Sequence, residues 1–306
     1  MVLTRIRTSE QNFLQVTKTL YVDGNRTDTY TPDGSIIRPF LTIQSAINQI
    51  ITNNDDTLNP YNVVIANGKY YETITLESLN LHRITLTGNG VVQIRPTTNE
   101  ALKSTTNNTN LVAFHLSGIT FLAPIVITGA NGSTAFNDVI WDDCNFVSGD
   151  GTQKANLSIT CINNLTIRQA YFDIDTITFN NVNYSVIDDS NVGSMFSITM
   201  DSTTNLPSQG ANGVALINSS MLMGAPSFTK VGSATLQFIT NSSTLLAGYS
   251  AGTVTIPSGV TVSAHSSFYR GTWTNNGVLN LKLHDSNVHS WNWNVIINWT
   301  ASKSSW

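Results

Sequence analysis

Short apolar strand patterns recur along most of the chain, and this recurrence limits the possible folds more than any other feature of the sequence. From residue 91 onward the patterns follow one another at intervals of about 20–30 residues, with no helical periodicity between them. Such an interval is typical of the coils of a β-solenoid, and it predicts roughly ten coils in a rod about 50 Å long. Asparagine pairs at residues 163–164 and 180–181 are expected at corners, where a left-handed backbone is needed. The apolar centres are Leu86, Leu116, Val139, Ile167, Ile187, Leu216, Phe238, Val262 and Leu281.

One amphipathic helix is predicted ahead of these strands, near residues 42–52. Thr42 is a suitable N-cap, because its hydroxyl can accept a hydrogen bond from the first turn. After a polar loop the period changes from 3.6 to 2, so that residues 62–76 are predicted to form a strand, a glycine turn and a second strand, and residues 84–90 repeat the pattern. The apolar face of the helix consists of Ile43, Ala46, Ile47, Ile50 and Ile51.

This order of elements resembles the opening of pectin methylesterases, within the pectin-lyase-like superfamily. The matching strings are Phe-x-Thr-Ile-Gln-x-Ala-Ile at residues 40–47 and Gly-x-Tyr-x-Glu at residues 68–72. The resemblance implies an all-β fold, a single right-handed parallel β-helix (solenoid) with an N-terminal capping helix over the edge of its first coil. A β-sandwich is the alternative. The early helix and the large number of strands favour the solenoid.

On this interpretation the chain has three parts. An N-terminal leader occupies residues 1–19, the β-helix with its capping helix occupies residues 20–264, and tryptophan-rich final coils with a C-terminal cap occupy residues 265–306. The late tryptophans could cap the open end of the solenoid, form a subunit contact around a threefold axis, or stack on sugars. They are Trp273, Trp291, Trp293, Trp299 and Trp306.

The low charge of the chain argues against several classes of function. Charged residues make up 11% of the sequence and the formal net charge is −4, so no basic surface for nucleic acid is expected. No apolar run reaches the ~18 residues of a membrane span, and residues 1–15 lack the apolar core of a secretory signal. Cys144 and Cys161 have no metal-ligand spacing and are expected to be buried thiols. We expect no cofactor and no metal site.

Two acidic pairs are the candidates for chemistry on a glycan. They are Asp142 with Asp143 and Asp188 with Asp189, and successive strand residues point to opposite faces, so one member of each pair can face a groove. Asp142 and Asp188 are the catalytic candidates. The strings that surround the catalytic acids of pectin methylesterases and polygalacturonases are missing, which favours solvated turns for these residues. Aromatic residues expected beside them, as glycan contacts, are Trp141, Tyr171 and Tyr184.

The sequence therefore favours a structural role over catalysis. The expected protein is a rigid rod on a virion, a phage appendage or another extracellular surface, made without a cleavable signal peptide. It is expected to form a homo-oligomer, with a trimer favoured, and to contact polysaccharide. The alternative is a carbohydrate-active enzyme, meaning a polysaccharide lyase, a hydrolase or an esterase-like protein, or a glycan-binding module.

Overall fold

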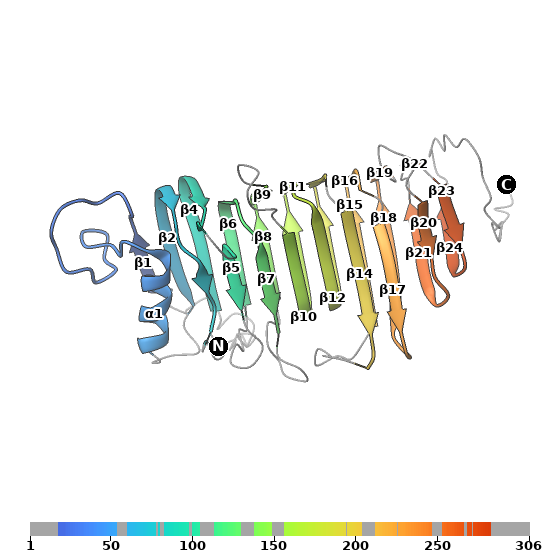
Figure 1. Ribbon diagram of the computed structural model, residues 1–306, viewed down its shortest axis with the longest axis horizontal. Helices are drawn as coiled ribbons and strands as arrows, with labels where there is room; N and C mark the ends of the chain where they lie inside the picture. Colours follow the sequence, from blue (N-terminus) through green and yellow to red (C-terminus); the bar gives the residue numbers. More distant parts are fainter. Residues whose placement is uncertain are drawn as a thin grey trace, which may run out of the picture.

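The protein is a rod of stacked β-strands with a short helix at its N-terminal end, as the computed structural model in Figure 1 shows. The structure describes residues 18–53, 60–77, 79, 83–97, 100–104, 113–129, 138–148, 156–193, 195–203, 212–224, 226–246, 253–265, 268–270 and 272–282. Within these ranges a 22-stranded sheet winds along the rod, and β20 pairs with β23 separately. All of these described pairings are parallel. The predicted all-β parallel β-helix with an N-terminal helix is confirmed.

The chain passes repeatedly through three sheet faces, which we call A, B and C in their cyclic order along the chain, and its first described strand lies on face B. Strands of face A are β3 (Ile74–Thr75), β5 (Leu102–Ser104), β7 (Ile125–Thr128), β14 (Met195–Asp201) and β17 (Pro226–Val231). Strands of face B are β1 (Lys18–Val22), β8 (Asp138–Asp142), β15 (Asn212–Asn218), β18 (Thr235–Asn241), β21 (Val260–His265) and β24 (Val278–Lys282). Strands of face C are β9 (Asn145–Val147), β11 (Tyr171–Asp173), β13 (Asn191–Val192), β16 (Met221–Leu222), β19 (Thr244–Leu246) and β22 (Phe268–Arg270).

Some strands bend and serve two faces. The longest, β10 (Asn156–Arg168) and β12 (Thr176–Asp188), run from face A into face B, while β2 (Tyr61–Tyr70), β4 (Arg83–Ile94) and β6 (Ala113–Phe121) run from B into C. The remaining pair, β20 (Thr253–Ile256) and β23 (Thr272–Asn275), lies near the C-terminal end of the described chain.

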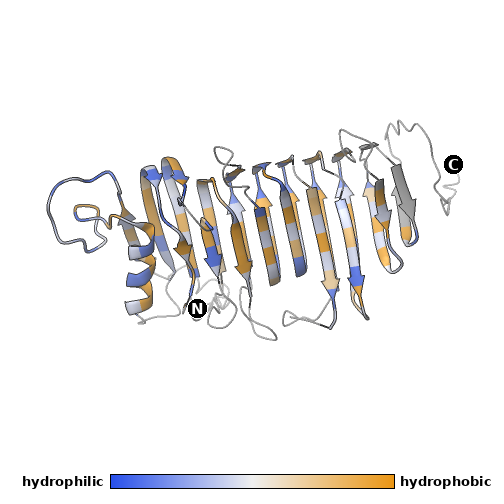
Figure 2. Cartoon of the chain, viewed as in Figure 1, coloured by the Kyte–Doolittle hydropathy of each residue, from blue (hydrophilic) through white to orange (hydrophobic). Residues whose placement is uncertain are grey.

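The interior of the rod is apolar and rich in stacked aromatic rings. Buried and more exposed residues alternate along the strands, and the alternation of hydrophobic and hydrophilic segments is visible in Figure 2. Inside face C the Phe146 ring stacks on Phe121, with centroids 5.6 Å apart, and on Phe172, with centroids 4.5 Å apart. Full burial of one such side chain stabilises the fold by about 1.5–3 kcal/mol, so the stack holds successive coils together.

Helix α1 (Ile43–Asn53) is fixed to the first coils by side chains of both resemblance strings. Thr42 Oγ1 accepts a hydrogen bond from the Ser45 N–H at 3.1 Å, as predicted for an N-cap. The carboxylate of Glu72 adds two more acceptors, at 2.8 Å from the Ile43 N–H and 2.9 Å from the Gln44 N–H. These bonds satisfy donors that a helix start leaves free. The apolar face of α1 is buried at Ile43, Ala46, Ile47 and Ile50.

The loop before α1 covers the outer hydrogen-bonding edge of β1. The Tyr21 N–H donates to Gly34 O, the Phe40 N–H donates to Tyr21 O, and the Asp23 N–H donates to Phe40 O, at 2.8–2.9 Å. Gly34 has a φ of 80°, and a Cβ there would strike the Phe40 ring, so glycine is required. An open strand edge is a template for unwanted pairing, and this loop closes it.

Corners of the coils use left-handed residues, as the sequence predicts, although not always the predicted ones. Asn181 has a φ of 50°, which confirms the corner at residues 180–181. In the preceding coil the left-handed residue is Cys161, with a φ of 62°, rather than either residue of the pair 163–164. Instead, Asn183 Nδ2 donates to the buried Asn163 Oδ1 at 3.4 Å. Cys161 and Cys144 are buried thiols, as predicted, and burial raises the pKa of Cys144 to about 12.

Replacing Glu72 with alanine is expected to destabilise the N-terminal end of the rod. The change leaves the Ile43 and Gln44 N–H groups without their acceptors, and loss of a helix cap costs about 0.5–2 kcal/mol. Glu72→Gln is the matched control, because it keeps one acceptor oxygen and should lose less. Urea unfolding followed by circular dichroism measures both variants. Equal stability of wild type and Glu72→Ala would contradict this role.

Candidate functional site

The two catalytic candidates lie in one column on the outer surface of face B. Asp142 ends β8 and Asp188 ends β12, and Arg168 at the end of β10 is in register between them. Two strand spacings therefore separate the two acids, roughly 10 Å along the rod. His115 Nε2 lies 2.9 Å from Asp142 Oδ2, and Arg168 Nη1 lies 3.7 Å from Asp142 Oδ1. Asp142 is thus the centre of a local polar cluster.

The aromatic candidates have different environments, and the prediction that Trp141 contacts a glycan is wrong. Trp141 is fully buried in β8, where its ring lies 5.2 Å from that of Phe146, so it cannot contact a glycan. It packs inward because it alternates with the outward Asp142. Tyr171 and Tyr184 are 45% and 41% exposed. The side chain of Trp273 in β23, and Trp291, Trp293 and Trp299, lie outside what the structure describes.

A shallow groove of about 690 Å³ follows the corner between faces B and C. It crosses five consecutive coils, a length of roughly 19 Å at one strand spacing per coil. The groove combines carboxylate, amide, hydroxyl and a few apolar side chains. Its lining residues are Asp143, Gln169, Ala170, Tyr171, Asp189, Ser190, Asn191, Ser219, Ser220, Met221, Ser242 and Thr244.

A column of left-handed residues forms the rim of this groove. In every coil of the groove, the first residue after the face B strand has a positive φ, and its N–H donates to the last residue of the next face B strand at 3.0–3.1 Å. All of these residues are exposed. They are Asp143 (φ 52°), Gln169 (φ 50°), Asp189 (φ 45°), Ser219 (φ 45°) and Ser242 (φ 48°).

The corner is hollow because the residue after each left-handed one is small and leaves the space above it unfilled. Ala170, Ser190 and Ser220 are buried there. Ser190 Oγ accepts from the Ala170 N–H at 3.1 Å and donates to Asp188 O at 2.8 Å, and Ser220 Oγ repeats this with the Ser190 N–H and Asn218 O. The serine hydroxyls are therefore occupied by the backbone, which leaves the rim side chains to meet a ligand.

In each acidic pair, the residue that lines the groove is not the one predicted as a catalytic candidate. Asp143 and Asp189 line it, whereas Asp142 and Asp188 lie on the neighbouring face B. Of the aromatic candidates whose side chains the structure describes, Tyr171 lines the groove. A repeated sequence pattern could have identified the groove: two polar residues followed by a small one, at the ends of five successive face B strands. It occurs at residues 142–144, 168–170, 188–190, 218–220 and 241–243.

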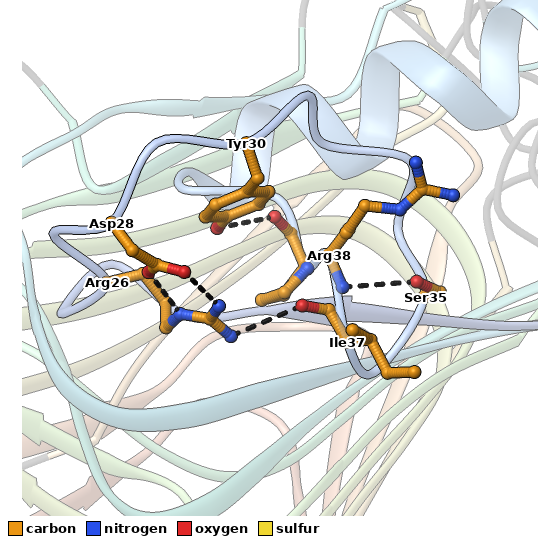
Figure 3. A network of polar contacts seen from close by, with 7 residues as sticks. Arg26, Asp28, Tyr30, Ser35, Ile37 and Arg38 are labelled. Atoms are coloured by element: carbon orange, nitrogen blue, oxygen red, sulfur yellow. Dashed lines mark hydrogen bonds and ion pairs between the residues drawn. The ribbon is translucent and has the colours of Figure 1, made fainter.

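The loop before α1 holds a second organised set of side chains (Figure 3). The guanidinium of Arg26 binds both carboxylate oxygens of Asp28, at 2.7 and 2.6 Å, and its Nη1 donates to Ile37 O at 3.3 Å. Arg26 also lies 4.9 Å from the centre of the Tyr30 ring, whose hydroxyl donates to Pro39 O at 3.0 Å. The contacts fix the loop conformation.

Two isoleucines project from this fixed loop. Asp33 and Arg38 form an ion pair, and the Arg38 N–H donates to Ser35 Oγ at 3.1 Å. Between them Ile36 and Ile37 are 69% and 75% exposed. They are the two most exposed large hydrophobic side chains among the described residues. We call residues 33–38 the isoleucine tip.

Within the described ranges, His, Cys, Asp and Glu side chains do not gather in groups of three or more that could hold a metal ion. The helical structure described here does not have the length and apolarity of a membrane span.

Comparison of the chain with protein-family models, with curated proteins and with solved structures finds no match. A function therefore has to be inferred from the fold, the groove between faces B and C, and the isoleucine tip.

Replacing Ser220 with alanine is expected to lower stability through the floor of the groove. The change leaves the buried Ser190 N–H without its acceptor, which costs about 1–3 kcal/mol. Ser219→Ala is the matched control, because Ser219 is exposed on the rim and should change stability by less than about 0.5 kcal/mol. Denaturant midpoints of the two variants test this. Equal effects would rule out the hydrogen-bonded floor.

Proposed function

We propose that the protein is a structural rod, used as a surface or appendage component of a virion or of another extracellular assembly. The supporting observation is the parallel ladder that continues from β1 to β24 through the described chain. Each coil adds about 4.8 Å of length and buries its apolar side chains against two neighbours. Such a stack resists bending and local opening, which suits a load-bearing spacer.

The assignment to the pectin-lyase-like superfamily, and the right-handed winding that it implies, belong to this proposal. Contacts between the two sequence strings that carry the resemblance support the superfamily assignment. Glu72, from the string at residues 68–72, caps helix α1, which begins within the string at residues 40–47, and Gln44 Oε1 accepts from the Thr75 N–H at 2.7 Å. The extracellular or virion location rests on what such rods are commonly used for.

We further propose that the rod assembles as a homo-oligomer, with a trimer favoured, through the isoleucine tip. Burial of Ile36 and Ile37 by neighbouring copies would remove two exposed aliphatic side chains from water. Both arginines of the loop are paired with aspartates of the same loop, so copies can approach without strong like-charge repulsion. The fixed loop loses little conformational entropy on contact.

The double variant Ile36→Ser/Ile37→Ser is expected to weaken the oligomer by at least about a hundredfold, because each buried isoleucine contributes roughly 1.5–3 kcal/mol. Size-exclusion chromatography with light scattering measures the mass over a range of concentrations. Val278→Ser, an exposed aliphatic near the other end of the rod, is the control and should not change the mass. A monomeric wild-type protein would defeat the proposed assembly.

The alternative function is a carbohydrate-active enzyme, and one observation favours it. Asp142 and Asp188 flank Arg168 at a spacing of roughly 10 Å, which is close to the 6.5–9.5 Å between the carboxyls of inverting glycosidases. If this alternative is correct, Asp188→Asn should lower glycan turnover by about a hundredfold or more. Reducing-end release from acidic and neutral polysaccharides measures it, with Asp173→Asn as control. Absence of turnover by the wild type would eliminate the alternative.

A further inference from the structure

The groove between faces B and C carries negative charge that its lining residues do not neutralise. Asp143 and Asp189 line it with their side chains exposed, and neither forms a side-chain hydrogen bond or ion pair with the described residues. Arg168 lies one residue before the rim, and its guanidinium is directed to Asp142, 3.7 Å away. Two carboxylates about 10 Å apart along the rod therefore repel a polyanion and attract a ligand with repeated positive charges.

The other lining groups suit a ligand with many hydroxyls and flat apolar faces. Gln169, Asn191 and Thr244 supply amide and hydroxyl groups that both donate and accept hydrogen bonds. Tyr171 and Met221 are 45% and 37% exposed, and they supply apolar surface on the face C side. Sugars combine hydroxyls with C–H faces, and an aromatic ring is a suitable surface for the latter.

The shape of the groove also favours a chain over a compact molecule. It runs roughly 19 Å along the rod, and its shallow floor of Ala170, Ser190 and Ser220 offers no deep enclosure. The backbone N–H groups at the rim are paired with the next coil, so an extended peptide cannot join them as an added strand. Recognition must come from side chains.

We propose that this groove binds an amino-sugar polymer, whose ammonium groups meet Asp143 and Asp189 and whose rings lie against Tyr171. Binding here is separate from the structural role, because the ladder and the isoleucine tip do not depend on the exposed groups of the rim. The pairing of polymer and rod is selective by charge, since uronic-acid polymers would place carboxylates against carboxylates.

Calorimetric titration of the full chain at about pH 5, where aspartate is ionised, tests this with three oligosaccharides of equal length: β-1,4-linked glucosamine, its N-acetylated form and galacturonate. We expect the glucosamine oligomer to bind best, the acetylated form several-fold more weakly, and galacturonate not at all. An oligolysine of similar charge should bind more weakly than the glucosamine oligomer. Preference for galacturonate, equal binding of oligolysine, or no binding of any sugar would overturn the proposal.

Variants then locate the site. Asp143→Asn/Asp189→Asn should weaken binding of the glucosamine oligomer by roughly fourfold or more, since each exposed ion pair contributes about two- to fivefold, and should abolish the preference over the acetylated oligomer. Asp173→Asn, the same change at an exposed residue outside the lining, should have no effect. Tyr171→Ala should weaken both sugars, and Tyr184→Ala should weaken neither. Equal losses in a variant and its control would place binding elsewhere.

Discussion

In-register parallel hydrogen bonding between successive coils is the constraint on which the other features of the rod depend. Asn164, Tyr184 and Val214 lie in one column, for example, because β10, β12 and β15 pair without a shift along face B. A residue type that occurs in one coil has only a local effect. When the same type occurs at the equivalent position of successive coils, its side chains form a line along the rod. Left-handed corners, small residues and buried hydroxyls all form such lines here.

The groove is a direct result of two neighbouring lines. Left-handed residues turn the chain sharply from face B to face C, and small residues directly after them leave the corner hollow. Buried serine hydroxyls would be costly if they were unpaired, but the column gives each one a backbone partner in an adjacent coil. The hollow is therefore stable without filling, and its chemistry can vary at the rim without disturbing the floor.

Sequence patterns predicted the features that depend on periodicity. The apolar periodicity predicted the ends of helix α1 to within a residue or two, and the intervals between strand patterns predicted the solenoid. The alternation of Val139, Trp141 and the polar residues between them could also have placed the Trp141 ring inside. Other features depend on contacts between distant segments. Sequence spacing does not reveal that Glu72 caps a helix that begins 29 residues earlier. Nor does it reveal that Asp143, rather than Asp142, adopts the left-handed conformation and lines the groove, because aspartate is compatible with either backbone conformation.

The two proposed contact surfaces rely on different physical forces, and this difference follows from how the rod is closed. The edge of β1 is already paired with residues 34–40, so association at that end cannot use strand addition and must use side chains, of which Ile36 and Ile37 are the most exposed large hydrophobic ones described. Burial of isoleucine does not weaken as salt rises. Contacts of ammonium groups with Asp143 and Asp189 are exposed and screened within about 8–10 Å at physiological salt. Raising the ionic strength should therefore release the amino-sugar polymer while the oligomer persists, which separates the groove from the tip in a single titration.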